Sequence, residues 1–182
     1  MGSCSNMDKK EIKVKENLLY KGKILDLYVD DVKCPNGNLT KREIINHCPG
    51  VGILVVNEKG ILLERQFRYA YGEEILEIPA GKVEQNENIV QAAIRELKEE
   101  TGCECNEMTF LGSIYPSTGY TNEIIHLFLA KSNVFTNQNL DEDEFIEWNF
   151  YSLEDVLTMI EDGKIKDAKT ISAIYFYLHK KH

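Results

Sequence analysis

Long hydrophobic runs are missing from this sequence, and so is an excess of basic residues. The longest apolar stretch, Val51–Val56, is far shorter than the roughly 20 residues that a membrane-spanning helix needs. Lysine and arginine number 21 against 30 aspartate and glutamate residues, which gives a net charge of −9. Binding to a nucleic-acid backbone needs clustered basic side chains. We therefore expect a soluble protein that binds neither membranes nor nucleic acid.

Paired cysteines and a secretion signal are also missing. The five cysteines are odd in number, and no hydrophobic segment of a signal peptide precedes them. Cys103 and Cys105 are spaced too closely for a zinc finger or a thioredoxin motif, which favours a packing role. Reduced thiols and a cytoplasmic location are expected.

Repeats, low-complexity tracts and linkers are absent too, so the 182 residues are expected to form one substantial core. Alternating hydrophobicity and turn residues predict strands at 12–20, 24–34, 39–47, 51–56, 61–66, 74–78, 108–115, 124–131 and 145–150. Helices are predicted between residues 81 and 103, from the capping box at Ser152 to residue 160, and at 170–179. The fold class is α+β, with a flexible N-terminus at 1–10, a small antiparallel sheet at 11–48 and a main domain at 49–182.

Glutamate, by contrast, is concentrated in one segment, residues 81–103, which reads GKVEQNENIVQAAIRELKEETGC. On a helix Glu96, Glu99 and Glu100 converge on one face, where like charges repel by a few tenths of a kcal/mol per pair. A solvated helix face is the plain alternative. Clustered carboxylates select hard divalent ions, so the spacing predicts a site for Mg²⁺ or Mn²⁺.

The same segment resembles the signature of the Nudix hydrolases. That signature is a Gly, five residues, a Glu, seven residues, Arg-Glu-aliphatic, one residue, Glu-Glu, one residue, and Gly-aliphatic. Every specified position is met except the last, where Cys103 replaces an aliphatic residue. Cysteine packs as a small hydrophobe, so the departure is minor.

The resemblance implies a Nudix-type α/β/α sandwich with a mixed sheet, in which the signature forms a loop, a helix and a loop. Gly81 lets the Ala80 carbonyl face the metals, and Gly102 ends the helix in a left-handed conformation. Glu87 and Arg95 form a structural ion pair that holds the loop against the helix. The reaction implied is hydrolysis of a nucleoside diphosphate linked to another group.

From about residue 18 onward the chain also resembles bacterial ADP-ribose pyrophosphatases, through the pieces KREIINH, ERQFRYA, EIPAGKVE, YPSTGYTNEIIHLFLA, LDEDEFIE and KIKDAKT. This resemblance implies a homodimer whose N-terminal sheets complete the substrate sites. It assigns the metal ligands as Ala80, Glu96, Glu99, Glu100 and Glu144. It assigns the catalytic residues as Glu142, a candidate base in the acidic segment 140–145, and Glu99.

Four residues match substrate contacts of that subfamily. Arg68 corresponds to a residue on the pyrophosphate, where a guanidinium can bind two oxygens at once. Arg42 corresponds to a residue near the adenine, and Gly119 with Glu123 to the loop that holds the terminal ribose. The subfamily has a Ser-Pro-Gly turn in this loop, whereas this chain has Thr118 in place of the proline.

Three functions therefore stay open. The leading one is an Mg²⁺-dependent pyrophosphatase of ADP-ribose or related ADP-sugars that releases AMP and a sugar phosphate. The second is a house-cleaning hydrolase of non-standard nucleoside triphosphates, although such proteins are usually shorter before residue 50. The third is a regulator that binds ADP-ribose without cleaving it, although regulators typically carry a degraded signature and a DNA-binding domain.

Overall fold

The computed structural model describes residues 9–105, 107–140, 142 and 144–179, and this part of the chain divides into two compact units. The first holds the described residues up to Cys48 together with Ser117–Glu123, and the second holds Pro49–Pro116 and the described residues from Ile124 onward. Most of the expected flexible terminus, residues 1–8, lies outside the described residues. The segment 117–123 was expected within the domain 49–182, but it packs with the N-terminal sheet.

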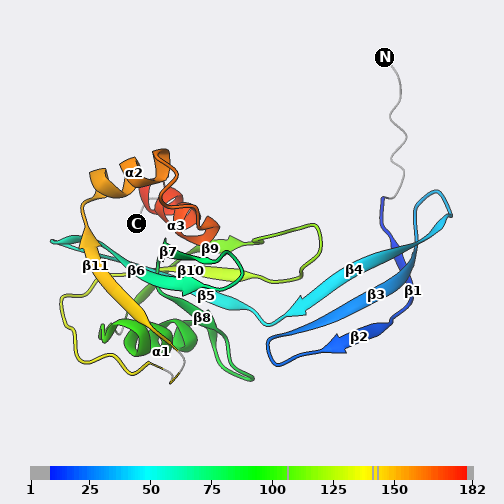
Figure 1. Cartoon of the computed structure of the whole chain (residues 1–182), viewed down its shortest axis with the longest axis horizontal. Coiled ribbons are helices and arrows are strands. Elements are labelled where there is room, and N and C mark those ends of the chain that lie inside the picture. The colour runs from blue at the N-terminus through cyan, green and yellow to red at the C-terminus, as the bar shows by residue number, and fades with distance from the viewer. Residues whose placement is uncertain (1–8, 106, 141, 143, 180–182) are drawn as a thin grey trace, which may run out of the picture. The chain divides into compact units, whose positions relative to one another are not determined.

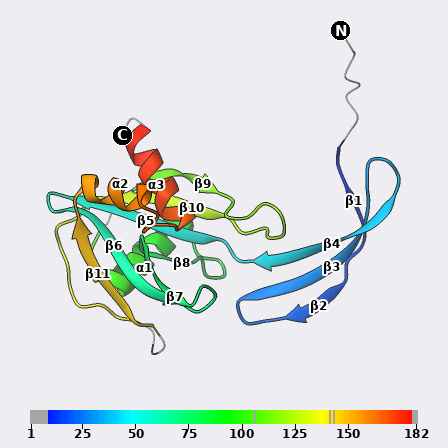
Figure 2. The same cartoon turned by 45° about the horizontal axis from the view of Figure 1, so that its top comes forward.

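The first unit is built around a four-stranded antiparallel sheet with β3 at its centre (Figure 2). Its strands are β1 (Ile12–Lys15), β2 (Leu18–Lys21), β3 (Leu25–Lys33) and β4 (Leu39–His47). β1 and β2 pair with successive parts of β3, so the predicted strand at 12–20 is interrupted. At the interruption the Asn17 side-chain amide donates to the Val29 carbonyl at 3.0 Å. The turn between β3 and β4 contains Gly37, whose φ of 88° suits glycine.

The second unit contains a seven-stranded mixed sheet in the order β11-β6-β5-β10-β9, with β7 paired to β6 and β8 to β5. Among the strands that the structure describes in this sheet, only β5 and β10 pair in parallel. The strands are β5 (Gly50–Asn57), β6 (Gly60–Arg68), β7 (Glu73–Glu77), β8 (Ala80–Lys82), β9 (Met108–Ile114), β10 (Ile125–Ala130) and β11 (Ile146–Tyr151). β8 was not predicted, because three residues are too few to show a hydrophobic alternation.

Helices cover both faces of this sheet (Figure 1). They are α1 (Ile89–Thr101), α2 (Leu153–Glu161) and α3 (Ala168–His179). Successive strand residues point to opposite faces. Leu62 accordingly packs in the core cluster that contains Leu97 of α1, and Leu63 in the cluster that contains Val156 of α2 and Ile174 of α3. The predicted α/β/α sandwich with a separate small sheet is confirmed.

Local signals set the ends of two helices. Asn88 caps α1 by accepting the Val90 N–H at 2.8 Å, and Gly102 ends it with a left-handed φ of 70°. Ser152 caps α2 through the Asp155 N–H at 3.1 Å, as the capping box predicts. Within the described ranges, no helix combines the length and the apolar character needed to cross a membrane.

Candidate active site

The segment from β8 to α1 packs closely against the helix at Gly81. A Cβ on Gly81 would lie 1.9 Å from Cδ of Glu96. The backbone of the loop therefore touches a carboxylate of the helix directly. The absence of a side chain at residue 81 is what allows Glu96 to occupy this place.

Arg95 connects the loop to the helix. Its Nε and Nη2 donate to the two oxygens of Glu87 at 2.9 Å each, and Nη2 also donates to the Lys82 carbonyl at 3.0 Å. Its Nη1 lies 2.9 Å from Oε1 of Glu96 and 3.0 Å from Oε2 of Glu99. The hydrogen bonds from Arg95 lower the pKa of Glu87 to about 2.

Glu100 is the most buried glutamate of the helix, with 4% of its surface exposed. Its Oε2 accepts the Ala80 N–H at 2.9 Å. Burial raises the pKa of Glu100 well above its usual value, and the charges of Glu64, Glu96 and Glu144 add to the rise. Burial also raises the pKa of Glu96, although the hydrogen bond and the positive charge of Arg95 lower it in part.

These carboxylates do not form a ready-made metal site in the structure. Within the described ranges, no group of three acidic, histidine or cysteine side chains is arranged to hold a metal ion. Arg95 holds Glu96 and Glu99, and the Ala80 N–H holds Glu100, so the metal-binding role expected of these three residues stays a prediction. The role expected of the Ala80 carbonyl stays a prediction.

The donor set nevertheless fits a hard divalent cation. All of its side chains offer carboxylate oxygens, the ligands that such ions prefer. Glu64, Glu96 and Glu144 each raise the pKa of Glu100 by their negative charge, so several acids share a buried region with too little positive charge. A divalent cation would relieve this repulsion, and Glu96, Glu100 and Glu144 are residues that would hold it.

The acidic segment 140–145 is described only in part, since residues 141 and 143 lie outside the described ranges. Glu144 is half-buried, and its negative charge contributes to the raised pKa of Glu96 and of Glu100. Glu142 is exposed in a turn. Glu144 thus lies near enough to the helix carboxylates for its charge to raise their pKa, and the role of Glu142 stays a prediction.

A second charged cluster centres on Glu77, which is 2% exposed. Arg68 Nε and Nη2 donate to its two oxygens at 2.7 and 2.9 Å, and Lys169 Nζ donates to the same carboxylate. Lys169 also pairs with Asp167 at 3.2 Å. Burial acts to lower the pKa of Lys169, but the charges of Asp167 and Glu77 outweigh it and raise that pKa.

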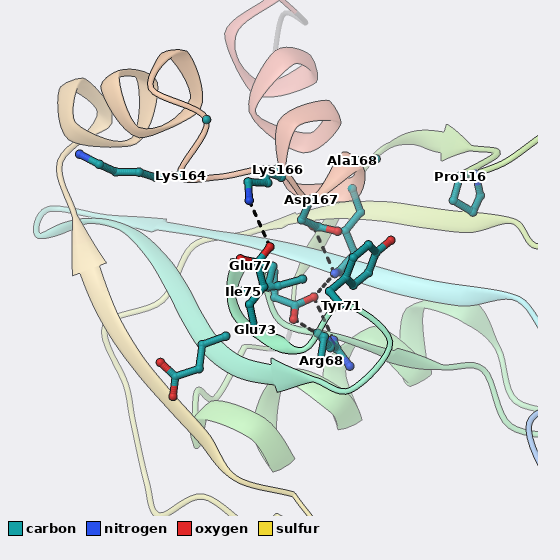
Figure 3. A pocket seen from close by; sticks show the side chains of 13 residues that line it. Arg68, Tyr71, Glu73, Ile75, Glu77, Pro116, Lys164, Lys166, Asp167 and Ala168 are labelled. Carbon is teal, nitrogen blue, oxygen red and sulfur yellow. Dashed lines mark hydrogen bonds and ion pairs between the residues drawn. The ribbon is translucent and has the colours of Figure 1, made fainter.

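A cavity of about 650 Å³ adjoins this cluster, a volume typical of small-molecule sites (Figure 3). Figure 3 shows that Arg68, from the end of β6, and Asp167, from the segment leading into α3, both line it. Tyr71 and Pro116 also line it. Arg68 is thus the one predicted substrate residue that the structure places at this cavity.

The other three predicted substrate residues lie in the first unit. Arg42, on β4, donates through Nε to Glu11 at 3.0 Å. Glu123 lies 3.6 Å from His47 Nδ1. Gly119 stands in open space, since a Cβ there would meet no atom within 4 Å. Its segment is tied to β4 by the Ile45 N–H, which donates to the Tyr120 carbonyl at 2.6 Å.

Sequence reasoning missed Glu64, Glu77, Lys169 and Asp167. Glu64 is fully buried, and neither of its carboxylate oxygens has a hydrogen-bond partner among the described residues. It lies directly across from Glu77 in the pairing of β6 with β7. The sequence did contain a signal for two of them. Glu64 follows three apolar residues in a predicted strand, which indicates a buried acid, and Lys169 belongs to the KIKDAKT piece that matches the subfamily.

The α/β/α sandwich with an acidic loop–helix segment is typical of one class of hydrolases. Comparison with known proteins identifies that class. Residues 46–174, more than half of the chain, match the NUDIX domain. The chain belongs to the Nudix family and is a Nudix hydrolase.

Several curated relatives are similar over nearly their whole length. The chain is 44% identical to an ADP-ribose pyrophosphatase of Bacillus subtilis (strain 168), over 87% of each chain. It is 40% identical to a methanol dehydrogenase activator of Bacillus methanolicus, over 90% of each chain. It is also 36% identical to a GDP-mannose pyrophosphatase of Citrobacter koseri, over 82% of this chain and 84% of the relative.

A solved structure supports the fold independently. The crystal structure of an ADP compounds hydrolase superposes with a TM-score of 0.83 at 21% identity, over 93% of this chain and 92% of that one. At this identity the likeness establishes the fold alone.

Proposed function

We propose that the protein hydrolyses the pyrophosphate bond of ADP-ribose or a related ADP-sugar, releasing AMP and a sugar phosphate, with Mg²⁺ as its ion and Mn²⁺ as a substitute. The observation that carries the proposal is the position of two carboxylates beside β8, where Glu96 packs against Gly81 and Glu100 accepts the Ala80 N–H, with the charge of Glu144 acting on both. The similarity to ADP-ribose and GDP-mannose pyrophosphatases supports the substrate class.

In the proposed reaction, water attacks one phosphorus of the pyrophosphate, and the bond from that phosphorus to the bridging oxygen breaks. Glu142 is proposed to take the proton from the water, with Glu99 as a second catalytic carboxylate. A bound divalent cation would neutralise phosphate charge and lower the pKa of the attacking water. Arg68 donates hydrogen bonds to the phosphates. Arg42, Gly119 and Glu123 are proposed to contact the adenosine and the terminal ribose.

We also propose that the protein is a homodimer. The first unit exposes large apolar side chains on its strands and turns, which is unusual for a monomer surface. They are Ile12, Val14, Leu18, Leu19, Tyr20, Ile24 and Leu39.

The first experiment follows products by phosphorus NMR after incubation with Mg²⁺ and ADP-ribose, GDP-mannose or 8-oxo-dGTP. AMP and ribose 5-phosphate are expected to form fastest.

Glu100→Gln should lower kcat by at least about a hundredfold, because it removes a ligand charge, while the melting temperature stays unchanged or rises.

Glu104→Gln is the matched control, since Glu104 is exposed and pairs only with Lys98 among the described residues. It should keep full activity. Full activity in Glu100→Gln would contradict the metal assignment. Preferred release of pyrophosphate from 8-oxo-dGTP would instead indicate the house-cleaning activity, and tight binding of ADP-ribose without turnover would indicate the regulator.

A further inference from the structure

The two edges of the Arg68 guanidinium have different surroundings. Nε and Nη2 form a bidentate contact with Glu77. The Nη1 atom has no hydrogen-bond partner among the described residues, and Arg68 lines the 650 Å³ cavity. One edge is therefore fixed by the protein, and the other remains available to a ligand. A guanidinium held in this way binds phosphate without first losing conformational freedom.

The fixed edge depends on a carboxylate that two cations contact. Glu77 is 2% exposed, and Glu64, a second buried acid, lies directly across from it. A second cation on Glu77 fixes the position of this carboxylate, so that Arg68 is held in place by it. Lys169 supplies the second positive charge, through a hydrogen bond to Oε2 of Glu77.

Lys169 is itself held in place by the start of α3. Asp167 lies 3.2 Å from Lys169 Nζ and accepts the Thr170 N–H at 2.9 Å and the Thr170 hydroxyl at 2.6 Å. Thr170 Oγ1 in turn accepts the N–H of Ile78, the residue after Glu77, at 2.9 Å. The helix start and the end of β7 are thus joined by both an ion pair and a hydrogen bond.

We propose that Lys169 is a positioning residue for the reaction, which acts through Glu77 to hold Arg68 with its free edge toward a substrate phosphate. This inference rests on the proposed function. It adds a residue of α3 that lies outside the Nudix signature.

The test is a double-mutant cycle with Lys169→Met and Glu77→Gln, measured as kcat and KM for ADP-ribose with saturating Mg²⁺. Each single variant should raise KM by about tenfold or more, with a smaller change in kcat, because substrate binding loses a pre-oriented contact. In the Glu77→Gln background, Lys169→Met should add less than about a twofold change, because the interaction through which Lys169 acts is already gone.

The double variant also separates positioning from folding. Lys169→Met leaves Glu77 buried with one cation fewer and can lower stability, whereas the double variant removes both charges and should melt near the wild type. A raised KM at a normal melting temperature is a result that a purely structural role would not produce. Lys98→Met is the matched control, since it breaks an exposed ion pair, to Glu104, and should leave KM unchanged.

An unchanged KM in Lys169→Met, with an active wild type, would overturn this inference and leave the proposed function intact. Equal effects of Lys169→Met with and without Glu77→Gln would overturn it as well, since they would show that Lys169 acts independently of Glu77. Absence of ADP-ribose hydrolysis by the wild type would contradict the proposed function and remove this inference with it.

Discussion

At the scale of single residues, Glu64 is a source of instability. Burial, followed by the charge of Glu77, raises its pKa from 4.5 to about 8. Between these two values the folded protein keeps a proton that the unfolded chain has released. The free energy of unfolding therefore decreases as pH rises through this range. The decrease due to Glu64 is complete above the folded pKa.

Replacing Glu64 with Gln should remove this loss, because the amide does not ionise. In EDTA, urea unfolding at about pH 9 should show the variant more stable than the wild type by a few kcal/mol at most, and at about pH 5 the difference should shrink. Glu147→Gln, an exposed change on β11, is the control and should be neutral at both pH values. An equal difference at both pH values would show that Glu64 does not titrate in this way.

At the scale of elements, two glycines that flank α1 serve different purposes. The Cβ added by Gly81→Ala would meet the end of the Glu96 side chain, which can move away. The Cβ added by Gly102→Ala would lie 2.1 Å from the backbone oxygen of Thr136, at a residue whose φ is +70°.

The same substitution should therefore give opposite phenotypes at the two sites. Gly81→Ala should lower kcat by about tenfold or more through the displaced Glu96, with a change in stability below about 1 kcal/mol. Gly102→Ala should cost more than about 1 kcal/mol of stability. Urea unfolding and kcat for ADP-ribose measure both. An active Gly81→Ala enzyme would show that Glu96 does not need its observed position.

At the scale of the whole molecule, the exposed apolar side chains of the first unit predict self-association. Light scattering should give twice the 20.9 kDa of one chain. Leu19→Asp places a charge on a side chain that is 65% exposed and should shift the protein toward monomer, because a charge is costly to bury in an apolar interface. Lys23→Asp, at a nearby exposed position, should leave the mass unchanged. A wild type with the mass of one chain would contradict the homodimer.

Much of the fold could be predicted from the sequence because its signals are local. Alternation predicted β4 at its observed bounds, and the Ser152 capping box predicted the start of α2. Elements without a local pattern were missed, such as the three-residue β8 and the interruption between β1 and β2. The first exists because it pairs with β5, and at the second Asn17 hydrogen-bonds the β3 carbonyl of Val29.

The sequence alone determined that Glu96, Glu99 and Glu100 would share one helix with Arg95, because helical spacing depends only on residue separation. The tertiary structure decided how those carboxylates are held, and which acids from other strands lie near them. It also brought Lys169 to Glu77, 92 positions apart along the chain. Burial and pairing between distant segments depend on how the sheet and its helices pack, and no local spacing in the sequence records that packing.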